Sequence, residues 1–179
     1  MSRKMLAVAA FALMAPIAMA QAQIQFGVAA GASIPNGDFS QTNETGYHLM
    51  ATAGIHPPAS PVGFRVDGMW NQFNFKSTVL NGESFRIMSL NANAVLAMPG
   101  AVVLSPYAIG GVGMYNSKAS VSGSTSSNDM GVNIGAGVKF GLAGFGAFAE
   151  ARFHNVFVDN GSGGSTSLRF IPITFGITF

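Results

Sequence analysis

The sequence predicts an all-β protein, an eight-stranded antiparallel up-and-down transmembrane β-barrel that follows a cleaved signal peptide. Three observations lead to this prediction. Apolar and polar residues alternate over eight segments, and only 9% of the residues are charged, whereas soluble domains have about 25%. No segment after the leader is an apolar run of about 18 residues, so spanning helices are not expected. A closed barrel is the other structure that satisfies every backbone group in lipid.

The first twenty residues have the organisation of a secretory signal peptide. A basic start precedes an apolar core, Met5–Ala15, and the small-residue cleavage motif Ala18-Met19-Ala20. The apolar core is too short to be a spanning helix. We therefore expect a signal peptide at residues 1–20 and one barrel domain at residues 21–179, with cleavage after residue 22 as the alternative.

The predicted barrel domain is electrically neutral. The chain has nine Lys and Arg and seven Asp and Glu, and two of the nine, Arg3 and Lys4, belong to the leader. A neutral domain has no basic field that would attract nucleic acid. The chain also has no Cys, so disulfides and lipid attachment through a cysteine are excluded. Nucleic acid is therefore not expected as a partner.

The first four predicted strands alternate large apolar residues with small or polar ones. Ile24–Ile34 has Ile, Phe, Val and Ala at its even positions and Gln, Gly, Ala and Ser at its odd positions. Thr45–His56 alternates Tyr, Leu, Ala and Ile with residues that include two His. Val62–Phe75 alternates Val, Phe and Trp with Arg, Asp and Asn, and Phe85–Met98 alternates Met, Leu and Ala with Ser and Asn. Successive side chains of a strand point to opposite faces, so each segment has one apolar and one polar face.

The last four predicted strands follow the same rule with one exception. Val102–Tyr115 carries three glycines, and its two faces are ambiguous. Met130–Phe140 alternates Met, Val, Ile and Ala with Gly, Asn and Lys, and Phe145–Val156 alternates Phe and Ala with Glu, Arg and His. The closing segment, Arg169–Phe179, has Ile and Phe at its odd positions from residue 171 and Pro, Thr and Gly opposite them. Alternation repeated over so many segments is typical of a membrane barrel.

The connections between these strands alternate between short and long. Tight turns that contain Pro or Gly occupy residues 57–61, 99–101 and 141–144, and longer polar segments occupy residues 35–44, 76–84, 116–129 and 159–167. Membrane barrels have short periplasmic turns and longer outer loops. We therefore predict four extracellular loops, with both termini in the periplasm.

The polar face places several ionisable residues inside the predicted barrel. We expect a lumen charge network whose members are Arg65, Asp67, Lys139, Glu150, Arg152 and His154. Charges in a narrow lumen must be paired or hydrated, and eight strands enclose an interior that side chains about fill. The first interpretation is a salt-bridged core that blocks conduction. The alternative is a gated channel, in which Arg152 changes its partner from Glu150 to Asp67.

Aromatic residues near strand ends or on apolar faces are expected at the boundary between lipid and water, as in the girdles of membrane barrels. These residues are Phe26, Tyr47, Phe64, Trp70, Tyr115, Phe140, Phe145, Phe153 and Phe179. The competing interpretation is a soluble lipocalin-type barrel whose apolar face surrounds a small ligand. A soluble exterior needs many Lys and Glu, but the opposite face has mainly Gly, Asn, Ser and Thr. The membrane barrel is therefore favoured.

Three segments resemble the OmpA/OmpX-like eight-stranded outer-membrane β-barrel domain family. Ser105–Tyr115 is similar to the fifth-strand pattern of that family, Phe148–His154 to its seventh strand and Pro172–Phe179 to its closing strand. The resemblance implies an outer-membrane location, and we expect a monomer in contact with outer-membrane lipid and lipopolysaccharide. In that family the terminal aromatic residue is the recognition signal for the barrel-assembly machinery, and Phe179 stands at that position.

No catalytic, cofactor or metal motif emerges from the sequence. Small outer-membrane barrels include lipid A deacylases, whose pattern has a Ser two residues after the His, and none of His48, His56 and His154 is followed by one. Three scattered His without Cys lack the spacing of a zinc site. Gly110-Gly111-Val112-Gly113 lies inside a predicted strand with no helix after it, so it is no nucleotide-binding loop. We expect a non-enzymatic protein with a structural or surface-interaction role, and a small gated channel is the alternative.

Overall fold

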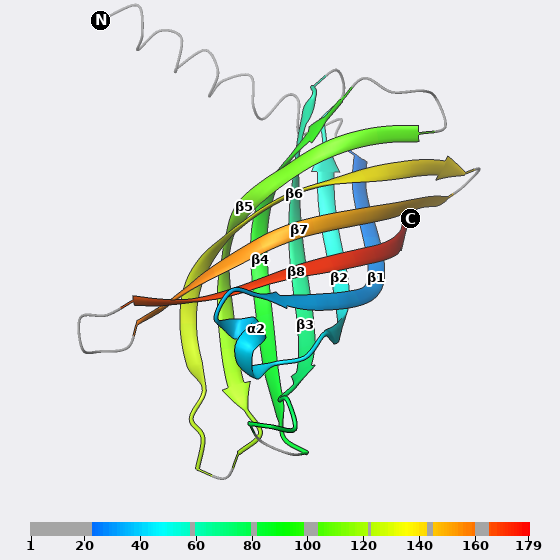
Figure 1. Cartoon of the computed structure of the whole chain (residues 1–179). Helices are drawn as coiled ribbons and strands as arrows, with labels where there is room; N and C mark the ends of the chain where they lie inside the picture. The colour runs from blue at the N-terminus through cyan, green and yellow to red at the C-terminus, as the bar shows by residue number, and fades with distance from the viewer. Residues whose placement is uncertain are drawn as a thin grey trace, which may run out of the picture.

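Figure 1 shows the computed structural model of the chain, which describes residues 23–57, 60–79, 82–98, 104–121, 123–142, 145–159 and 165–179. The strands are β1 (Gln23–Asn36), β2 (Gly46–His56), β3 (Val62–Asn74), β4 (Ser84–Ala97), β5 (Leu104–Ala119), β6 (Ser127–Leu142), β7 (Phe145–Asp159) and β8 (Ser165–Thr178). A short helix, α2 (Phe39–Thr42), lies between β1 and β2. The predicted signal peptide and both predicted cleavage positions lie outside the described residues.

The eight strands form a closed barrel, as the sequence predicts. Each strand is antiparallel to the next in chain order, and β1 closes the barrel by pairing with β8. In that closing pair the Cα partners include Val28 with Ile177 and Ala32 with Ile173. Closure leaves no open sheet edge, so the strands satisfy their backbone groups without help from solvent.

The apolar face of the barrel points outward. Every strand has at least one exposed apolar residue on this face. Examples, one from each strand in order, are Ile24, Leu49, Phe64, Leu90, Met114, Ile134, Phe153 and Phe175. The buried set contains many polar side chains, including Asp67, Asn91 and Arg152. The interpretation as a soluble lipocalin-type barrel is therefore wrong, because it requires the apolar side chains to face inward. Among the described residues, no helix has the length and hydropathy needed to cross a bilayer.

Two ends of the barrel can be distinguished. The terminal end holds the start of β1 and the end of β8, together with the ends of β2 and β4. The loop end holds α2 and the longer connections after β3 and β5 (Figure 1). The described parts of the predicted loops at residues 35–44, 76–84 and 116–129 lie at the loop end. The predicted turn at residues 99–101 lies outside the described residues, as do residues 143–144 and 160–164 of two other predicted connections.

The strands at the loop end are longer than predicted. β5 continues to Ala119 and β6 begins at Ser127, so half of the predicted loop at 116–129 belongs to these two strands. Asn116 and Asn128 face each other in this strand pair, and the Asn116 side chain donates a hydrogen bond of 2.8 Å to Oδ1 of Asn128. A strand that projects into water needs no apolar face, so alternation of hydropathy ends before the strand does.

The ambiguous faces of β5 have a definite assignment in the structure. Tyr107, Ile109 and Tyr115 point into the barrel and are buried, while Val112 and Met114 are exposed on the outside. The expectation that Tyr115 belongs to an aromatic girdle is therefore wrong. Both faces of this strand carry large apolar or aromatic residues, so hydropathy alone could not assign them.

The first predicted loop contains the short helix α2. The loop is tied to the next connection by backbone hydrogen bonds of 2.9 Å from Glu44 to Asn74 and from Lys76 to Thr42. These contacts hold Phe39 over the mouth of the barrel, where its side chain is buried. The helix is too short to be recognised from periodicity in the sequence.

Candidate functional site

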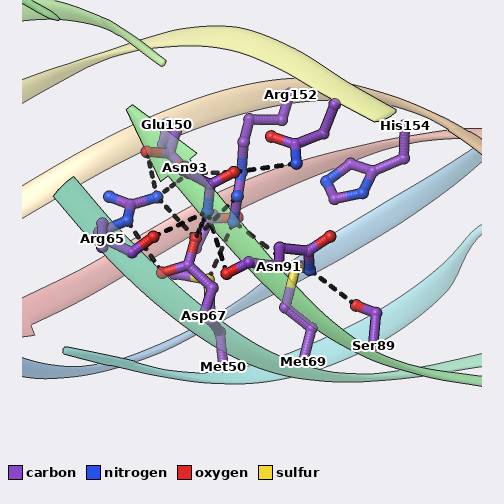
Figure 2. A network of polar contacts seen from close by, with 12 residues as sticks. Met50, Arg65, Asp67, Met69, Ser89, Asn91, Asn93, Glu150, Arg152 and His154 are labelled. Carbon is purple, nitrogen blue, oxygen red and sulfur yellow. Dashed lines mark hydrogen bonds and ion pairs between the residues drawn. The ribbon is translucent and has the colours of Figure 1, made fainter. Parts of the chain in front are cut away.

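The polar centre of the lumen is built mainly by β3 and β7, which lie on opposite sides of the barrel. β3 contributes Arg65 and Asp67, and β7 contributes Glu150 and Arg152. In each pair the residues are two apart, so both side chains of a strand point to the same face. Figure 2 shows the four side chains converging between the strands. We refer to these four residues as the lumen ion cluster.

Every carboxylate of the lumen ion cluster contacts both arginines. Arg65 lies 2.9 Å from Oδ1 of Asp67 and 2.8 Å from Oε2 of Glu150. Arg152 lies 2.8 Å from Oδ2 of Asp67 and 2.8 Å from Oε1 of Glu150. The two positive and two negative charges therefore form a closed ring with no net charge. All four side chains are buried, and burial of a charge is tolerated only with such pairing.

Neutral polar groups surround the lumen ion cluster (Figure 2). The hydroxyl of Tyr107 donates a 2.7 Å hydrogen bond to Oε2 of Glu150, and the amide of Asn93 donates a 2.9 Å bond to Oδ2 of Asp67. Asn133 in turn donates to Oδ1 of Asn93 at 2.9 Å. These donors use the remaining lone pairs of the carboxylates, which is what makes a buried polar network stable.

The structure places Lys139 and His154 in the lumen but outside the ion cluster. The ammonium group of Lys139 donates to Oε1 of Gln25 at 3.4 Å, and within the described residues it forms no ion pair. The His154 ring stacks on Phe170 with 4.9 Å between centroids, and its Nδ1 lies 2.9 Å from the Tyr115 hydroxyl. The sequence predicts one network of six residues, but only four of them form the ion cluster. Lys139 and His154 lie at other heights along the barrel.

The loop end of the lumen is closed by apolar side chains that we call the mouth plug. Its members are Phe39, Phe73, Ile87, Tyr115, Val156 and Phe170. The Phe39 ring makes edge contacts with Phe73 at 5.0 Å and with Phe85 at 5.4 Å between centroids. At the terminal end a small cavity of about 40 Å³ reaches Arg65 and Lys139. Water that enters from the terminal end therefore meets first the lumen ion cluster and then the mouth plug.

A second polar cluster contains a serine and a histidine in contact, a pair that the sequence pattern does not predict. Ser33 Oγ lies 3.0 Å from Nδ1 of His48 and donates its proton to Oδ1 of Asn71 at 2.8 Å. Nε2 of His48 lies 3.0 Å from the hydroxyl of Thr174. A serine hydroxyl has one proton, so Nδ1 of His48 donates to Ser33 and does not accept from it. The histidine is therefore not arranged as a base for this serine.

The described residues include no group of three or more His, Asp or Glu placed to hold a metal ion. The glycine run of β5 also has a structural explanation. Gly111 and Gly113 are the Cα partners of Asn93 and Asn91, and a Cβ at either position would run into the side chain of its partner asparagine. Glycine is therefore required where lumen side chains crowd against the neighbouring strand.

Comparisons with known proteins agree with this geometry. The model of a family described as outer membrane protein beta-barrel domain matches residues 5–179. No curated protein matches the chain. The solved structure of Neisserial surface protein A (NspA) superposes with a TM-score of 0.71 at 14% identity, covering 88% of this chain and 97% of that chain.

Two further solved structures are similar at the level of the fold. A major outer membrane protein from Thermus thermophilus has a TM-score of 0.56 at 14% identity and covers 88% of this chain and 99% of its own. The outer membrane enzyme PagL has a TM-score of 0.54 at 16% identity and covers 87% of this chain and 98% of its own. At such identities these structures establish the fold, and the barrel they share carries more than one kind of function.

Proposed function

The chain belongs to the outer membrane protein beta-barrel domain family and lies in the outer membrane. From this premise we propose that it is a sealed, non-enzymatic barrel. Its role would be to hold four loops at the cell surface for interaction with other molecules. The observation that carries the proposal is the closed lumen ion cluster. A barrel whose cross-section is filled by paired charges serves as a rigid support and does not serve as a conduit.

The contacts within the lumen support a sealed barrel over a gated channel. The gating alternative has Arg152 moving from Glu150 to Asp67, but Arg152 contacts both carboxylates at once. Opening would separate buried charges that have no other charged partner among the described residues, which costs several kcal/mol per ion in a low-dielectric interior. The mouth plug adds a second barrier between the cluster and the loop end.

The proton assignment at Ser33 and His48 supports a protein without hydrolytic activity. The similarity to the enzyme PagL concerns the fold alone, at 16% identity. The Ser33 hydroxyl and the His48 ring are both buried in the lumen, so a lipid substrate in the bilayer does not reach them. Release of fatty acid from outer-membrane lipids by the wild type, with loss of that release in Ser33→Ala, would contradict this part of the proposal.

The closing strand is the proposed contact with the barrel-assembly machinery. Phe179 is exposed on the outer face beside β1, and its backbone exchanges hydrogen bonds of 2.9 and 3.0 Å with Phe26. An exposed terminal aromatic ring next to the closing seam is accessible to a partner before β1 and β8 pair. We propose further that the folded barrel is a monomer in contact with outer-membrane lipid and lipopolysaccharide.

Conductance in planar lipid bilayers tests the sealed lumen. We expect no discrete current steps from the folded wild-type protein, with insertion verified separately by protease protection in liposomes of the same lipid. Arg65→Gln disturbs the lumen ion cluster, and Arg169→Gln removes one exposed cation from the outside of β8 as the matched control. Discrete current steps in the wild type would refute the proposal if Arg65→Gln changes the size of the steps and Arg169→Gln does not. That result would show that the lumen conducts.

A further inference from the structure

We propose that the outer surface of β3, β4 and β5 at the loop end binds the phosphorylated head group of a membrane glycolipid, whose acyl chains lie in the apolar groove directly below. The site consists of a cationic pocket formed by Trp70, Gln72, Arg86, Lys118, Ser120 and Ser124. It lies on the lipid-facing side of the barrel and is separate from the lumen. The inference rests on the proposed contact with lipopolysaccharide, which it makes specific, and it does not depend on the proposed sealed lumen.

Two cations face the same pocket from neighbouring strands. Arg86 and Lys118 are Cα partners in the β4–β5 pair, and Gln72 is the partner of Arg86 in the β3–β4 pair. Their chain neighbours Ile87 and Ser117 are buried in the lumen, so Arg86 and Lys118 point outward. Two like charges side by side repel each other, and an anion between them would remove that repulsion.

No carboxylate of the described chain neutralises these cations. The ion pairs of the described residues all belong to the lumen ion cluster. The Nε atom of Arg86 is buried and has no hydrogen-bond partner in the part of the chain that the structure describes. The guanidinium fork and the ammonium group are both suited to phosphate.

The pocket has the size of a polar head group and opens onto an apolar groove. Its volume is about 440 Å³. A larger groove of about 710 Å³ begins at Trp70, which belongs to both, and runs toward the middle of the barrel. Leu49, Gly68 and Leu90 all line the groove. Gly68 has open space where a Cβ would stand, which adds to the depth of the groove.

The order of residues along the strands matches the order of chemical groups in an amphiphile. The row Gln72, Arg86 and Lys118 lies on the loop side of Trp70 and Met88, which form the next outward-facing row toward the membrane. Trp70 stacks edge-on with Tyr47 at 5.6 Å, and aromatic pairs of this kind mark the boundary between lipid and water. A phosphate at the cationic row therefore places attached acyl chains in the groove. Inorganic phosphate would use the cations and leave the groove empty.

Native mass spectrometry of the folded barrel in detergent micelles tests the proposal by titration with three probes. The probes are a bisphosphorylated hexa-acyl glucosamine disaccharide, the same lipid after removal of both phosphates, and inorganic phosphate. Two variants are compared with the wild type. The first combines Arg86→Gln with Lys118→Gln, and the second is Gly68→Leu, whose side chain fills the groove. Arg169→Gln with Lys76→Gln is the control that removes the same charge elsewhere. Heat-dependent gel mobility verifies that each variant is folded.

We expect the phosphorylated lipid to bind the wild type and the control pair equally, and to bind the Arg86 and Lys118 double variant at least about tenfold more weakly. Removal of the phosphates should weaken binding to the wild type by a similar factor, and Gly68→Leu should weaken binding of both lipids. Equal affinity of the double variant and the control pair would overturn the proposal. Displacement of the lipid by inorganic phosphate at equal concentration would overturn the assignment to a lipid head group.

Discussion

Arg152 is one of two arginines that join the two sides of the lumen, and Arg65 is the other. The guanidinium of Arg152 contacts Asp67 from β3 and Glu150 from its own strand, and its Nη2 atom lies 3.1 Å from the sulfur of Met50 on β2. A planar guanidinium has five donors in a fixed fork, whereas a lysine is a single charged point. Arginine is therefore the side chain that can contact both carboxylates of the ring at once.

Replacement of Arg152 by alanine should destabilise the barrel strongly. The change leaves Asp67 and Glu150 with one arginine between them, and an uncompensated buried charge costs about 3–5 kcal/mol. The measurement is the free energy of unfolding from urea titration in lipid vesicles. Arg169→Ala is the control, since Arg169 is exposed and hydrogen-bonds only to Asn155 among its described contacts. Equal unfolding midpoints for wild type and Arg152→Ala would refute the role of this residue.

At the scale of a single element, β6 is shaped by the side chains that it faces. Gly135 is the Cα partner of Arg152, and a Cβ at Gly135 would lie 2.6 Å from Cγ of that arginine and still closer to the Ala151 carbonyl oxygen. Gly135 must therefore be glycine for the arginine to cross the lumen. Gly131 and Gly137 of the same strand are crowded instead by the rings of Tyr115 and Tyr107 on β5.

Gly135→Ala should consequently destabilise the barrel by about 1–3 kcal/mol, the usual cost of overpacking a filled interior. Gly68→Ala on β3 is the matched control, because a Cβ at Gly68 meets no atom within 4 Å on the outer face. The control should leave stability unchanged or raise it slightly. The comparison is made by urea unfolding of both variants in the same vesicles. A larger loss for Gly68→Ala than for Gly135→Ala would contradict the inward and outward assignment.

The helix α2 is the element whose contacts hold the mouth plug together. Phe39 is 3% exposed and meets two aromatic rings from β3 and β4. Phe39→Ala should cost about 3 kcal/mol of stability and open the first loop to protease, because it leaves a cavity under the helix. Val79→Ala in the next loop is the control, since Val79 is exposed. Protease cleavage at unchanged rates in Phe39→Ala would show that the helix does not depend on this ring.

At the scale of the whole molecule, the proposed orientation in the membrane can be measured with introduced cysteines. The chain has no cysteine of its own, so a single new thiol reports one position. Thr125→Cys lies at an exposed position in the connection after β5 at the loop end, and Met98→Cys lies after β4 at the terminal end. We expect a membrane-impermeant maleimide to label intact cells carrying Thr125→Cys, and to label Met98→Cys only after the outer membrane is permeabilised. The reverse pattern would invert the topology.

Most of the barrel could be predicted from the sequence because its signals are local. Alternation of apolar and polar residues assigns a face to each strand without reference to any other strand, and this worked for β4 and β8. It did not work for β5, where Tyr107 and Tyr115 are aromatic but point into the lumen. Aromatic residues that carry a hydroxyl can serve either face, and only their hydrogen-bond partners decide between them.

The sequence by itself determined the closed barrel, its outward apolar face and the strands that carry its charges, because low charge and period-two alternation permit few other structures in lipid. The tertiary structure alone decided which charges meet. Arg65 and Glu150 are far apart in the chain and come within 2.8 Å because the strand register sets β3 against β7 at that height. Lys139 lies on the same inner face but at another height, away from the ring. Height along a barrel follows from strand stagger, which is a property of the closed sheet and of no single strand.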